Sequence, residues 1–289
     1  MKNKIICLTF WFLAFPCLAL DNADFSYISN KKIKIGVIKN YGAIIGFFSK
    51  MPDGKNFINT YDAGREIQQS FYGGYDGSRW WNKNWRWNPV QGGSHENDKS
   101  KLLEFKNTGE KIYAKINPRN WAGKQLLKDV VMEETITLDN EIAHVKFKCI
   151  YSGTNNHPEI HQELPAVFID AEYDTLIYYD GKMPWSGDKL TQKIPGFPNE
   201  EIQSYENWNA YVKNDYGIGV YTPGSDKVTC YRFIRTNTNK PADLSCSYFA
   251  PVRTMAVTTN FAFEYDVYLT IGNTKEIRER FYKIHKQRL

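Results

Sequence analysis

The amino-acid sequence predicts one large antiparallel β domain followed by a short C-terminal helix. Apolar and polar residues alternate in short runs over most of the chain, and turn residues separate these runs. Aromatic residues make up 15% of the sequence, and many lie inside the alternating runs, as strand propensity favours. No internal repeat or linker interrupts the series, so residues 21–289 are predicted to form a single domain.

The strands are expected to begin with a hairpin over residues 31–50. Its two arms alternate between apolar and polar residues, and Asn40, Tyr41 and Gly42 form the turn between them. Further runs with strand character follow, each bounded by turn residues. These runs lie at residues 111–118, 130–138, 142–153, 165–171, 174–181, 208–214, 217–224, 227–234 and 261–272.

The C-terminal tail is expected to form the one helix of appreciable length. Over residues 274–287, Ile277, Phe281 and Ile284 recur at helical spacing and share one face. Thr274 is the expected N-cap, because a threonine side chain can accept a hydrogen bond from the first turn.

Residues 1–20 have the organisation of a secretory signal peptide. Lys2 and Lys4 give a basic start, and an apolar run that is too short to span a bilayer follows them. Small residues then precede an expected cleavage site after Ala19 or Leu20. We therefore expect an exported product, either periplasmic or secreted.

The charge argues against nucleic acid as a partner. The net charge of the full chain is +5, and removal of the two signal-peptide lysines lowers it to +3. The basic residues are spread along the chain rather than gathered in a block. No stretch after the signal peptide is long and apolar enough to span a membrane. No glycine loop has the context that cradles a phosphate, and no cofactor is expected.

Three cysteines follow the signal peptide. Cys230 and Cys246 are the expected disulfide pair in an oxidising compartment, because a short turn-rich loop between neighbouring strands can bring them together. Cys149 lies in a strand pattern and is expected to be a buried thiol. The alternative that all three are free thiols stays open, because spacing alone does not fix the pairing.

Residues 56–94 differ in character from the strands around them. The segment is rich in Gly, Asn and Tyr and holds four of the eight tryptophans. Aromatic faces among amide and guanidinium side chains suit sugars, whose C–H faces stack on the rings. Trp85 and Trp87 are therefore candidate ligand-binding residues, with a loop that packs back over the sheet as the alternative. Trp208, at a strand start, is a further candidate, with an ordinary edge strand as its alternative.

A dense group of ionisable side chains lies at residues 157–163. His157, Glu159, His161 and Glu163 alternate, so in a strand they share one face. On a strand that enters a cleft, His161 and Glu163 suit acid–base chemistry, and the other two suit ligand contact. A metal site and a solvated strand end are the alternatives. The segment lacks the HExxH order of zinc proteases, and no metal is assigned.

Four segments, "DAGREIQQSFY", "WNPVQGG", "HQELPAVFI" and "GIGVYTPG", resemble a group of exported bacterial proteins of unsettled activity. That group has the galactose-mutarotase-like β-supersandwich fold, and the resemblance covers most of the mature chain. It implies a large antiparallel β-supersandwich with a carbohydrate ligand in its concave face.

The resemblance also suggests roles for single residues. Mutarotases pair a mid-chain histidine acid with a late glutamate base, for which His161 and Glu264 are the candidates, although the flanks of Glu264 do not match. Related polysaccharide lyases need a base and a group that neutralises a carboxylate, which Arg65, Gln68 and His161 can supply. We therefore expect an exported carbohydrate-active enzyme, a lyase, epimerase or hydrolase, with His161, Glu163 and Arg65 as catalytic residues. A non-catalytic glycan-binding protein that uses the tryptophan-rich loop is the alternative.

Overall fold

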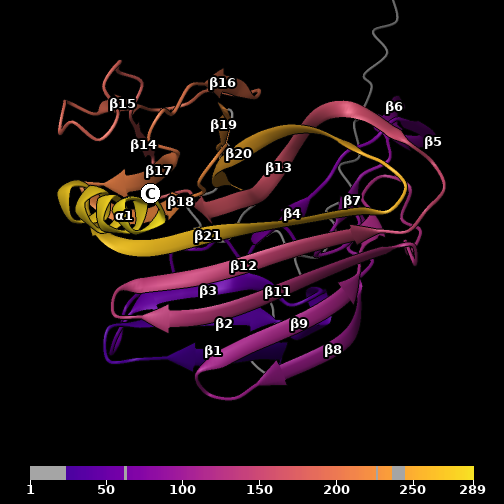
Figure 1. Cartoon of the computed structure of the whole chain (residues 1–289), viewed down its shortest axis with the longest axis horizontal. Coiled ribbons are helices and arrows are strands. Elements are labelled where there is room, and N and C mark those ends of the chain that lie inside the picture. The colour runs from indigo at the N-terminus through magenta and orange to yellow at the C-terminus, as the bar shows by residue number, and fades with distance from the viewer. Residues whose placement is uncertain (1–23, 62–63, 226, 236–244) are drawn as a thin grey trace, which may run out of the picture.

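The computed structural model describes residues 24–61, 64–225, 227–235 and 245–289. The predicted signal peptide, residues 1–20, lies outside these ranges. Within them, two large antiparallel sheets pack face to face, as Figure 1 shows, and a separate two-stranded hairpin stands beside them. None of the helices in these ranges is long and apolar enough to cross a membrane.

The first sheet has ten strands, and its centre is β13 (His157–Asp170), which pairs with β4 (Ile67–Ser70) on one side and β20 (Cys246–Val257) on the other. From one edge, the order is β1 (Phe25–Ser29), β2 (Ile33–Ile38), β3 (Ile44–Lys50), β4, β13, β20, β19 (Lys227–Phe233) and β16 (Glu200–Ile202). Two short strands, β7 (Pro89–Val90) and β10 (Arg119–Asn120), join the sheet at β4.

The second sheet has nine strands, and α1 (Thr274–Arg288) packs beside one end of it. The strand order is β15 (Thr191–Lys193), β14 (Thr175–Tyr178), β17 (Trp208–Lys213), β18 (Tyr216–Tyr221), β21 (Phe261–Asn273), β12 (Ile142–Tyr151), β11 (Val130–Asp139), β9 (Lys111–Asn117) and β8 (Lys101–Asn107). The separate hairpin consists of β5 (Tyr75–Trp80) and β6 (Lys83–Arg86), and it lies at the opposite end of the molecule from α1 (Figure 1).

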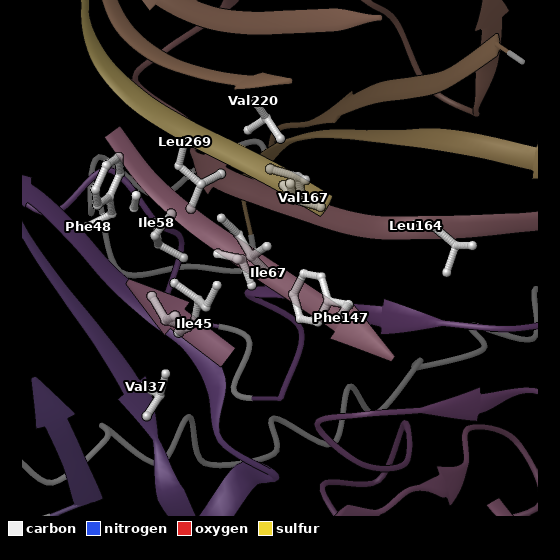
Figure 2. Close-up of a cluster of buried hydrophobic side chains, with 14 of the residues drawn as sticks. Val37, Ile45, Phe48, Ile58, Ile67, Phe147, Leu164, Val167, Val220 and Leu269 are labelled. Atoms are coloured by element: carbon white, nitrogen blue, oxygen red, sulfur yellow. The ribbon is translucent and has the colours of Figure 1, made fainter. Parts of the chain in front are cut away.

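The core lies between the two sheets. Alternation along each strand sends apolar side chains inward, and Figure 2 shows Ile45, Ile67 and Val167 from the first sheet in one cluster with Phe147 and Leu269 from the second. Burial of apolar surface at about 25 cal/mol per Å² makes this layer the main source of stability. The all-β architecture with a C-terminal helix, predicted from the alternating runs, is confirmed.

The opening hairpin is confirmed as β2 and β3. A single 3₁₀ turn joins the strands and ends at Gly42, whose φ is 62°. A Cβ atom at this position would lie 2.2 Å from the carbonyl oxygen of Gln91. Glycine is therefore required both by the left-handed backbone and by the close approach of the neighbouring chain.

The C-terminal helix is also confirmed, but its N-cap is Asn273 rather than Thr274. The Asn273 side chain accepts a hydrogen bond from the backbone N–H of Glu276, and the Glu276 carboxylate accepts one from the backbone N–H of Asn273. This reciprocal pair is a capping box. Ile277 and Phe281 are buried from the apolar face of the helix, as their spacing predicted.

The predicted Cys230–Cys246 disulfide is wrong, because no disulfide joins any two of the three described cysteines, all of which are buried. The strand register pairs Cys230 with Phe249 and Cys246 with Phe233, so the two cysteines are three residues apart along β19 and β20. Three residues of strand span about 10 Å, and side chains at that offset point to opposite faces. A disulfide requires Cα atoms within about 7 Å. Cys149 lies in the core, as predicted.

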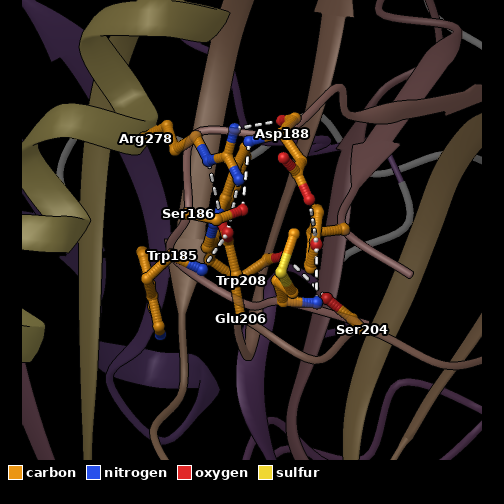
Figure 3. A network of polar contacts seen from close by, with 9 residues as sticks. Trp185, Ser186, Asp188, Ser204, Glu206, Trp208 and Arg278 are labelled. Atoms are coloured by element: carbon orange, nitrogen blue, oxygen red, sulfur yellow. Dashed lines mark hydrogen bonds and ion pairs between the residues drawn. The ribbon is translucent and has the colours of Figure 1, made fainter. Parts of the chain in front are cut away.

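A buried ion pair attaches α1 to the sheet. Arg278 donates from Nε to the Glu206 carboxylate at 3.0 Å, and the carboxylate also accepts from the Trp208 indole and the Trp185 backbone N–H, both at 2.7 Å. Figure 3 shows these groups around Glu206, with Arg278 also donating to the Asp188 carbonyl oxygen. The Glu206 side chain is fully shielded from solvent. One helix residue thus joins α1, the start of β17 and the loop before β15.

A second carboxyl, that of Glu134 on β11, is buried between the sheets. One of its oxygens accepts a hydrogen bond from Gln91 Nε2 at 3.0 Å, and the other has no hydrogen-bond partner among the described residues. Burial raises the pKa of Glu134 to about 8, although the hydrogen bond from Gln91 opposes this effect. The carboxyl is therefore largely protonated at neutral pH.

Replacement of Arg278 by methionine should lower the free energy of unfolding by about 3–5 kcal/mol, because it leaves the Glu206 carboxylate buried without its cation. Urea denaturation measures this change. Lys275→Met is the matched control on the same helix. Lys275 is exposed and pairs only with Glu279 at 3.9 Å, so its loss should change stability by less than about 0.5 kcal/mol. Equal effects of the two substitutions would contradict the role given to Arg278.

The Glu134 carboxyl should make stability fall as pH rises from about 5 to 8. In this range the folded protein retains a proton that the unfolded chain has lost, because the folded pKa is raised from 4.5 to about 8. The contribution is fully present below the unfolded pKa and is lost as pH rises, with a slope of about 1.4 kcal/mol per pH unit. Urea denaturation across this range should show that Glu134→Gln lacks the slope. Glu133→Gln, on the other face of β11, should keep it.

Candidate functional site

A cleft lies on the face of the first sheet that points away from the core. Alternation along the second half of β13 sends Val167 and Ile169 into the core, and Ala166 and Phe168 to the opposite face. Two cavities of about 310 and 290 Å³ lie over this face and share four lining residues. The shared residues are Tyr72, Trp85, Glu163 and Asn199. The two cavities therefore form one cleft with two lobes.

Glu163 is central to the cleft, because it lines both lobes. Its carboxyl accepts a hydrogen bond from the Tyr72 hydroxyl at 2.8 Å and another from Tyr248. The residue is only 8% exposed. Burial raises the pKa of Glu163, and the two tyrosine hydrogen bonds partly oppose this effect. Burial also raises the pKa of each tyrosine, so both remain hydroxyl donors at neutral pH.

His161 lies two residues before Glu163 and lines the second lobe. Its ring centroid is 5.5 Å from that of Tyr72. Burial, together with the positive charges of Arg86 and Lys227, lowers the pKa of His161. Its imidazole is therefore neutral at neutral pH and free to accept a proton. The predicted placement of His161 and Glu163 on one face of the strand agrees with the structure.

A wall of three tryptophans closes one side of the first lobe. Trp80 and Trp85 come from the β5–β6 hairpin and Trp121 from the turn after β10, and their ring centroids lie 4.9–5.2 Å apart. The hairpin turns through Trp81 and Asn82, whose φ angles of 47° and 61° are those of a type I′ turn. Trp81 is 83% exposed at the tip. Within the tryptophan-rich segment, β5 and β6 thus form a hairpin where a loop was predicted.

Arg65 and Gln68 also line the first lobe, and Arg65 is the one of the two that carries a charge. The Arg65 guanidinium lies 5.9 Å from the Trp121 ring centroid. The Gln68 amide donates to the backbone carbonyls of Gly64 and Arg65 and accepts from the N–H of Gly92. Gln68 therefore fixes the loop that carries Arg65, and its own amide is already occupied.

Comparison with known proteins identifies the architecture. No protein-family model and no curated protein sequence matches the chain. A solved galactose mutarotase related enzyme from Lactobacillus acidophilus is 12% identical, and the alignment covers 86% of this chain and 98% of that one with a TM-score of 0.57. A putative aldose 1-epimerase from Escherichia coli K12 is 9% identical, with 86% and 98% covered and a TM-score of 0.55. The fold is galactose-mutarotase-like.

The predicted galactose-mutarotase-like β-supersandwich is thus confirmed as a fold. The same architecture also occurs inside a larger enzyme, the 4-alpha-glucanotransferase from Thermococcus litoralis. That alignment covers 85% of this chain and 37% of the other, at 11% identity and a TM-score of 0.51. At such low identities the likeness concerns the fold, and the chemistry has to be argued from the residues of the cleft.

Two of the four clustered ionisable residues lie outside the cleft. His157 stacks on Trp87 with ring centroids 3.9 Å apart and an angle of 12°, and it is buried. The register of β13 shifts between His157 and Ile160, so the alternation is interrupted there and His157 packs against core residues. Glu159 is exposed and lines neither lobe. The prediction that all four residues share one face is therefore wrong.

Three further candidates serve the packing or the surface rather than the cleft. Trp87 is buried against His157, and Trp208 is buried against α1 with its indole bound to Glu206. Glu264 lies on β21 in the other sheet, where it is exposed and pairs with Lys146 at 3.1 Å. None of the three lines either lobe, so the ligand-binding role predicted for the two tryptophans and the base role suggested for Glu264 are not supported.

The sequence reasoning missed several residues of the cleft. Tyr72 could have been found, since it continues the alternation of Gln68 and Ser70 along β4. Tyr248 and Trp121 lie far from the other site residues in the chain, and only the strand pairing and loop packing bring them close. The missed lining residues with polar or aromatic side chains are Ser70, Tyr72, Tyr75, Trp80, Asn84, Arg86, Asn88, Trp121, Phe168, Phe197, Asn199, Tyr231 and Tyr248.

The alternative of a metal site gains no support from the geometry. Within residues 24–61, 64–225, 227–235 and 245–289, no group of three or more His, Cys, Asp or Glu side chains is arranged to hold a metal ion. His157 packs against Trp87 and Glu159 lines neither lobe, so the two do not join His161 and Glu163 in the cleft.

Removal of the Tyr72 hydroxyl should raise the pKa of Glu163 further. The hydrogen bond from Tyr72 favours the ionised carboxyl and so lowers the pKa, and Tyr72→Phe removes that bond while the burial remains. Titration of the ¹³C-labelled glutamate carboxyls by NMR measures the change. Tyr75→Phe is the matched control, because Tyr75 is 73% exposed at the rim. A Glu163 pKa that falls or stays constant in Tyr72→Phe would contradict this assignment.

Proposed function

We propose that the protein is an exported carbohydrate-active enzyme that acts on a poly- or oligosaccharide in the cleft by acid–base chemistry. The observation that carries the proposal is the Glu163 carboxyl. It is buried, raised in pKa and held by Tyr72 and Tyr248, beside a histidine whose pKa is lowered. Two neighbouring titratable groups whose pKa values are shifted in opposite directions suit an acid and a base that act in one reaction.

The lining of the first lobe supports a sugar as the ligand. Trp80, Trp85 and Trp121 present aromatic surface, while Arg65 and the buried carboxyl of Glu163 supply polar groups. Sugars have both kinds of surface, since their C–H faces are apolar and their hydroxyls form hydrogen bonds. The similar structures point the same way, because a galactose mutarotase related enzyme and a putative aldose 1-epimerase act on sugars by their descriptions.

The protonation states assign the roles. Burial raises the pKa of Glu163 and so favours the protonated carboxyl, the form that can donate to an oxygen of the sugar. His161 is neutral and can remove a proton from the ligand. Arg65 can hold vicinal hydroxyls or a carboxylate through its planar guanidinium. This set of groups suits a lyase, an epimerase or a hydrolase, and no step in these roles requires a cofactor.

Export is part of the proposal and rests on the signal-peptide pattern of residues 1–20. Mass spectrometry of the protein recovered from the producing cells tests it. A mature N-terminus at residue 20 or 21 supports export, and an intact N-terminus on cytoplasmic protein contradicts it.

A glycan-binding protein without catalysis is the alternative, and the tryptophan wall is the observation that favours it. Three clustered indole rings give a stacking surface whether or not a reaction follows. In that case Glu163 and Tyr72 would serve as hydrogen-bonding groups for the bound sugar.

Glu163→Gln should lower turnover roughly 100-fold or more, because it removes the proton donor while it keeps the size of the side chain. A screen of polysaccharides, with product reducing ends and unsaturated-uronate absorbance both recorded, measures the activity. Glu159→Gln is the matched control on the same strand, and it should retain full turnover because Glu159 is exposed outside the cleft.

The same screen separates the two functions. Turnover that is lost in Glu163→Gln while glycan binding remains would establish the enzyme. Glycan binding without turnover in the unsubstituted protein, abolished by Trp85→Ala, would establish the binding protein instead. If Trp85→Ala and Glu163→Gln both leave a demonstrated glycan activity unchanged, the cleft is not the site.

A further inference from the structure

The second lobe of the cleft differs in character from the first. The first lobe has a largely aromatic lining, whereas the second is lined by His161, Arg86, Asn84 and Tyr75 beside the shared residues. Among the described residues that line the second lobe, Arg86 is the one arginine or lysine. The lobe therefore combines a positive charge with hydrogen-bonding side chains, and it shares Trp85 and Glu163 with the first lobe.

The hairpin places this charge through simple alternation. Trp85 belongs to the tryptophan wall and lines both lobes, whereas its neighbours Asn84 and Arg86 alternate with it along β6 and line only the second lobe. Arg86 lies opposite Tyr75 in the strand register, and its guanidinium is 5.6 Å from the Tyr75 ring centroid. This contact with an aromatic ring holds the guanidinium at the lobe. One hairpin thus supplies an aromatic surface to the first lobe and a cation to the second.

The charge of Arg86 is not neutralised by a neighbouring ion pair. Among the residues that the structure describes, no carboxylate forms an ion pair with Arg86. Lys227, whose charge also acts on His161, is already paired with Glu201 at 2.7 Å. The carboxyl that lines this lobe is that of Glu163. It accepts hydrogen bonds from two tyrosines, and burial raises its pKa. A positive guanidinium in a pocket without a matching carboxylate is a suitable site for an anionic ligand group.

We propose that the second lobe binds the carboxylate or sulfate group of an acidic sugar, and that the ligand is an acidic oligosaccharide that spans both lobes. One sugar ring stacks on Trp85 in the first lobe, and the acidic group of the neighbouring unit binds Arg86 and Asn84 in the second. Glu163 then lies beside the linkage between the two units. This inference rests on the proposed function and names its substrate class.

Selectivity against neutral glycans follows from the same contact. A neutral unit in the second lobe would displace water from the Arg86 guanidinium without supplying a counter-charge, which costs binding free energy. An acidic unit supplies two acceptor oxygens that match the planar guanidinium. The structure therefore predicts a preference for acidic over neutral chains of otherwise identical structure.

The test is binding of the full mature protein to an array of acidic and neutral oligosaccharides, followed by affinity measurements. The tightest-binding acidic glycan is compared with a form of the same glycan in which the acidic group has been neutralised. Carboxyl reduction tests whether the bound group is a carboxylate, and desulfation tests whether it is a sulfate. Arg86→Gln should weaken binding of the acidic glycan roughly tenfold or more, as expected for the loss of a charged hydrogen bond, and should remove the preference over the neutral form.

Arg79→Gln is the matched control. It removes the same charge from the same hairpin, but Arg79 is exposed, binds the carbonyl oxygen of Asn82 and lines neither lobe. Its affinity for the acidic glycan should stay within about twofold of that of the unsubstituted protein. Thermal unfolding checks that Arg86→Gln is folded, and the comparison of charged with neutralised ligand on the unsubstituted protein needs no variant.

The outcomes separate this inference from the proposed function. Neutral glycans that bind as tightly as acidic ones, or equal losses in Arg86→Gln and Arg79→Gln, overturn the acidic-ligand site. If either of these results is found while Trp85→Ala abolishes glycan binding, the proposed carbohydrate function stands and only the acidic substrate class is wrong. Absence of binding to every glycan on the array overturns both.

Discussion

The alternation of strand β13 is the constraint on which the core and the cleft both depend. The strand pairs with β20 on one side and, from Glu163 to Val167, with β4 on the other, and each of its faces is used. Leu164 and Val167 belong to the core, whereas Glu163 and Ala166 belong to the cleft. Core positions change from even to odd residue numbers between Leu164 and Val167, and cleft positions change from odd to even between Glu163 and Ala166. The register shift between Glu163 and Val167 accommodates this change. Any change to this shift would exchange core and cleft residues over half the strand.

The chemistry of the cleft arises from burial rather than from an excess of charge. Glu163 is surrounded by aromatic side chains and bound by two hydroxyl donors, which supply hydrogen bonds without a balancing positive charge. Desolvation then favours the protonated carboxyl, and the same cause acts in the opposite direction on His161 and favours the neutral ring. A single property of the site, its partial exclusion of water, thus shifts both side chains toward their uncharged forms.

The sequence predicted the fold well because the relevant signals are local. A strand period of two and a helical period of 3.6 are visible within ten residues, and they identified the sheets and α1 correctly. Of the predicted site residues, the structure brings His161, Glu163, Arg65, Gln68 and Trp85 together in the candidate cleft. The face of His157 was predicted wrongly because the register of β13 shifts after this residue. The pairing of Cys230 with Cys246 was predicted wrongly because no local pattern encodes the register between β19 and β20. Tyr248 and Trp121 were missed because only tertiary packing brings them to the site.

The β5–β6 hairpin is attached to the molecule in a way that separates the shape of the cleft wall from the packing of the two sheets. It forms no ladder with either large sheet, and at its base the N–H of Gly73 binds the carbonyl oxygen of Trp87 at 2.7 Å. An inserted or exchanged residue near Trp81 therefore changes the cleft wall without a change in the packing between the sheets. Evolution can alter such an appendage rapidly while the sandwich stays fixed. A designer who wished to redirect the protein to another ligand would graft a new hairpin at Gly74 and Arg86 and leave the scaffold untouched.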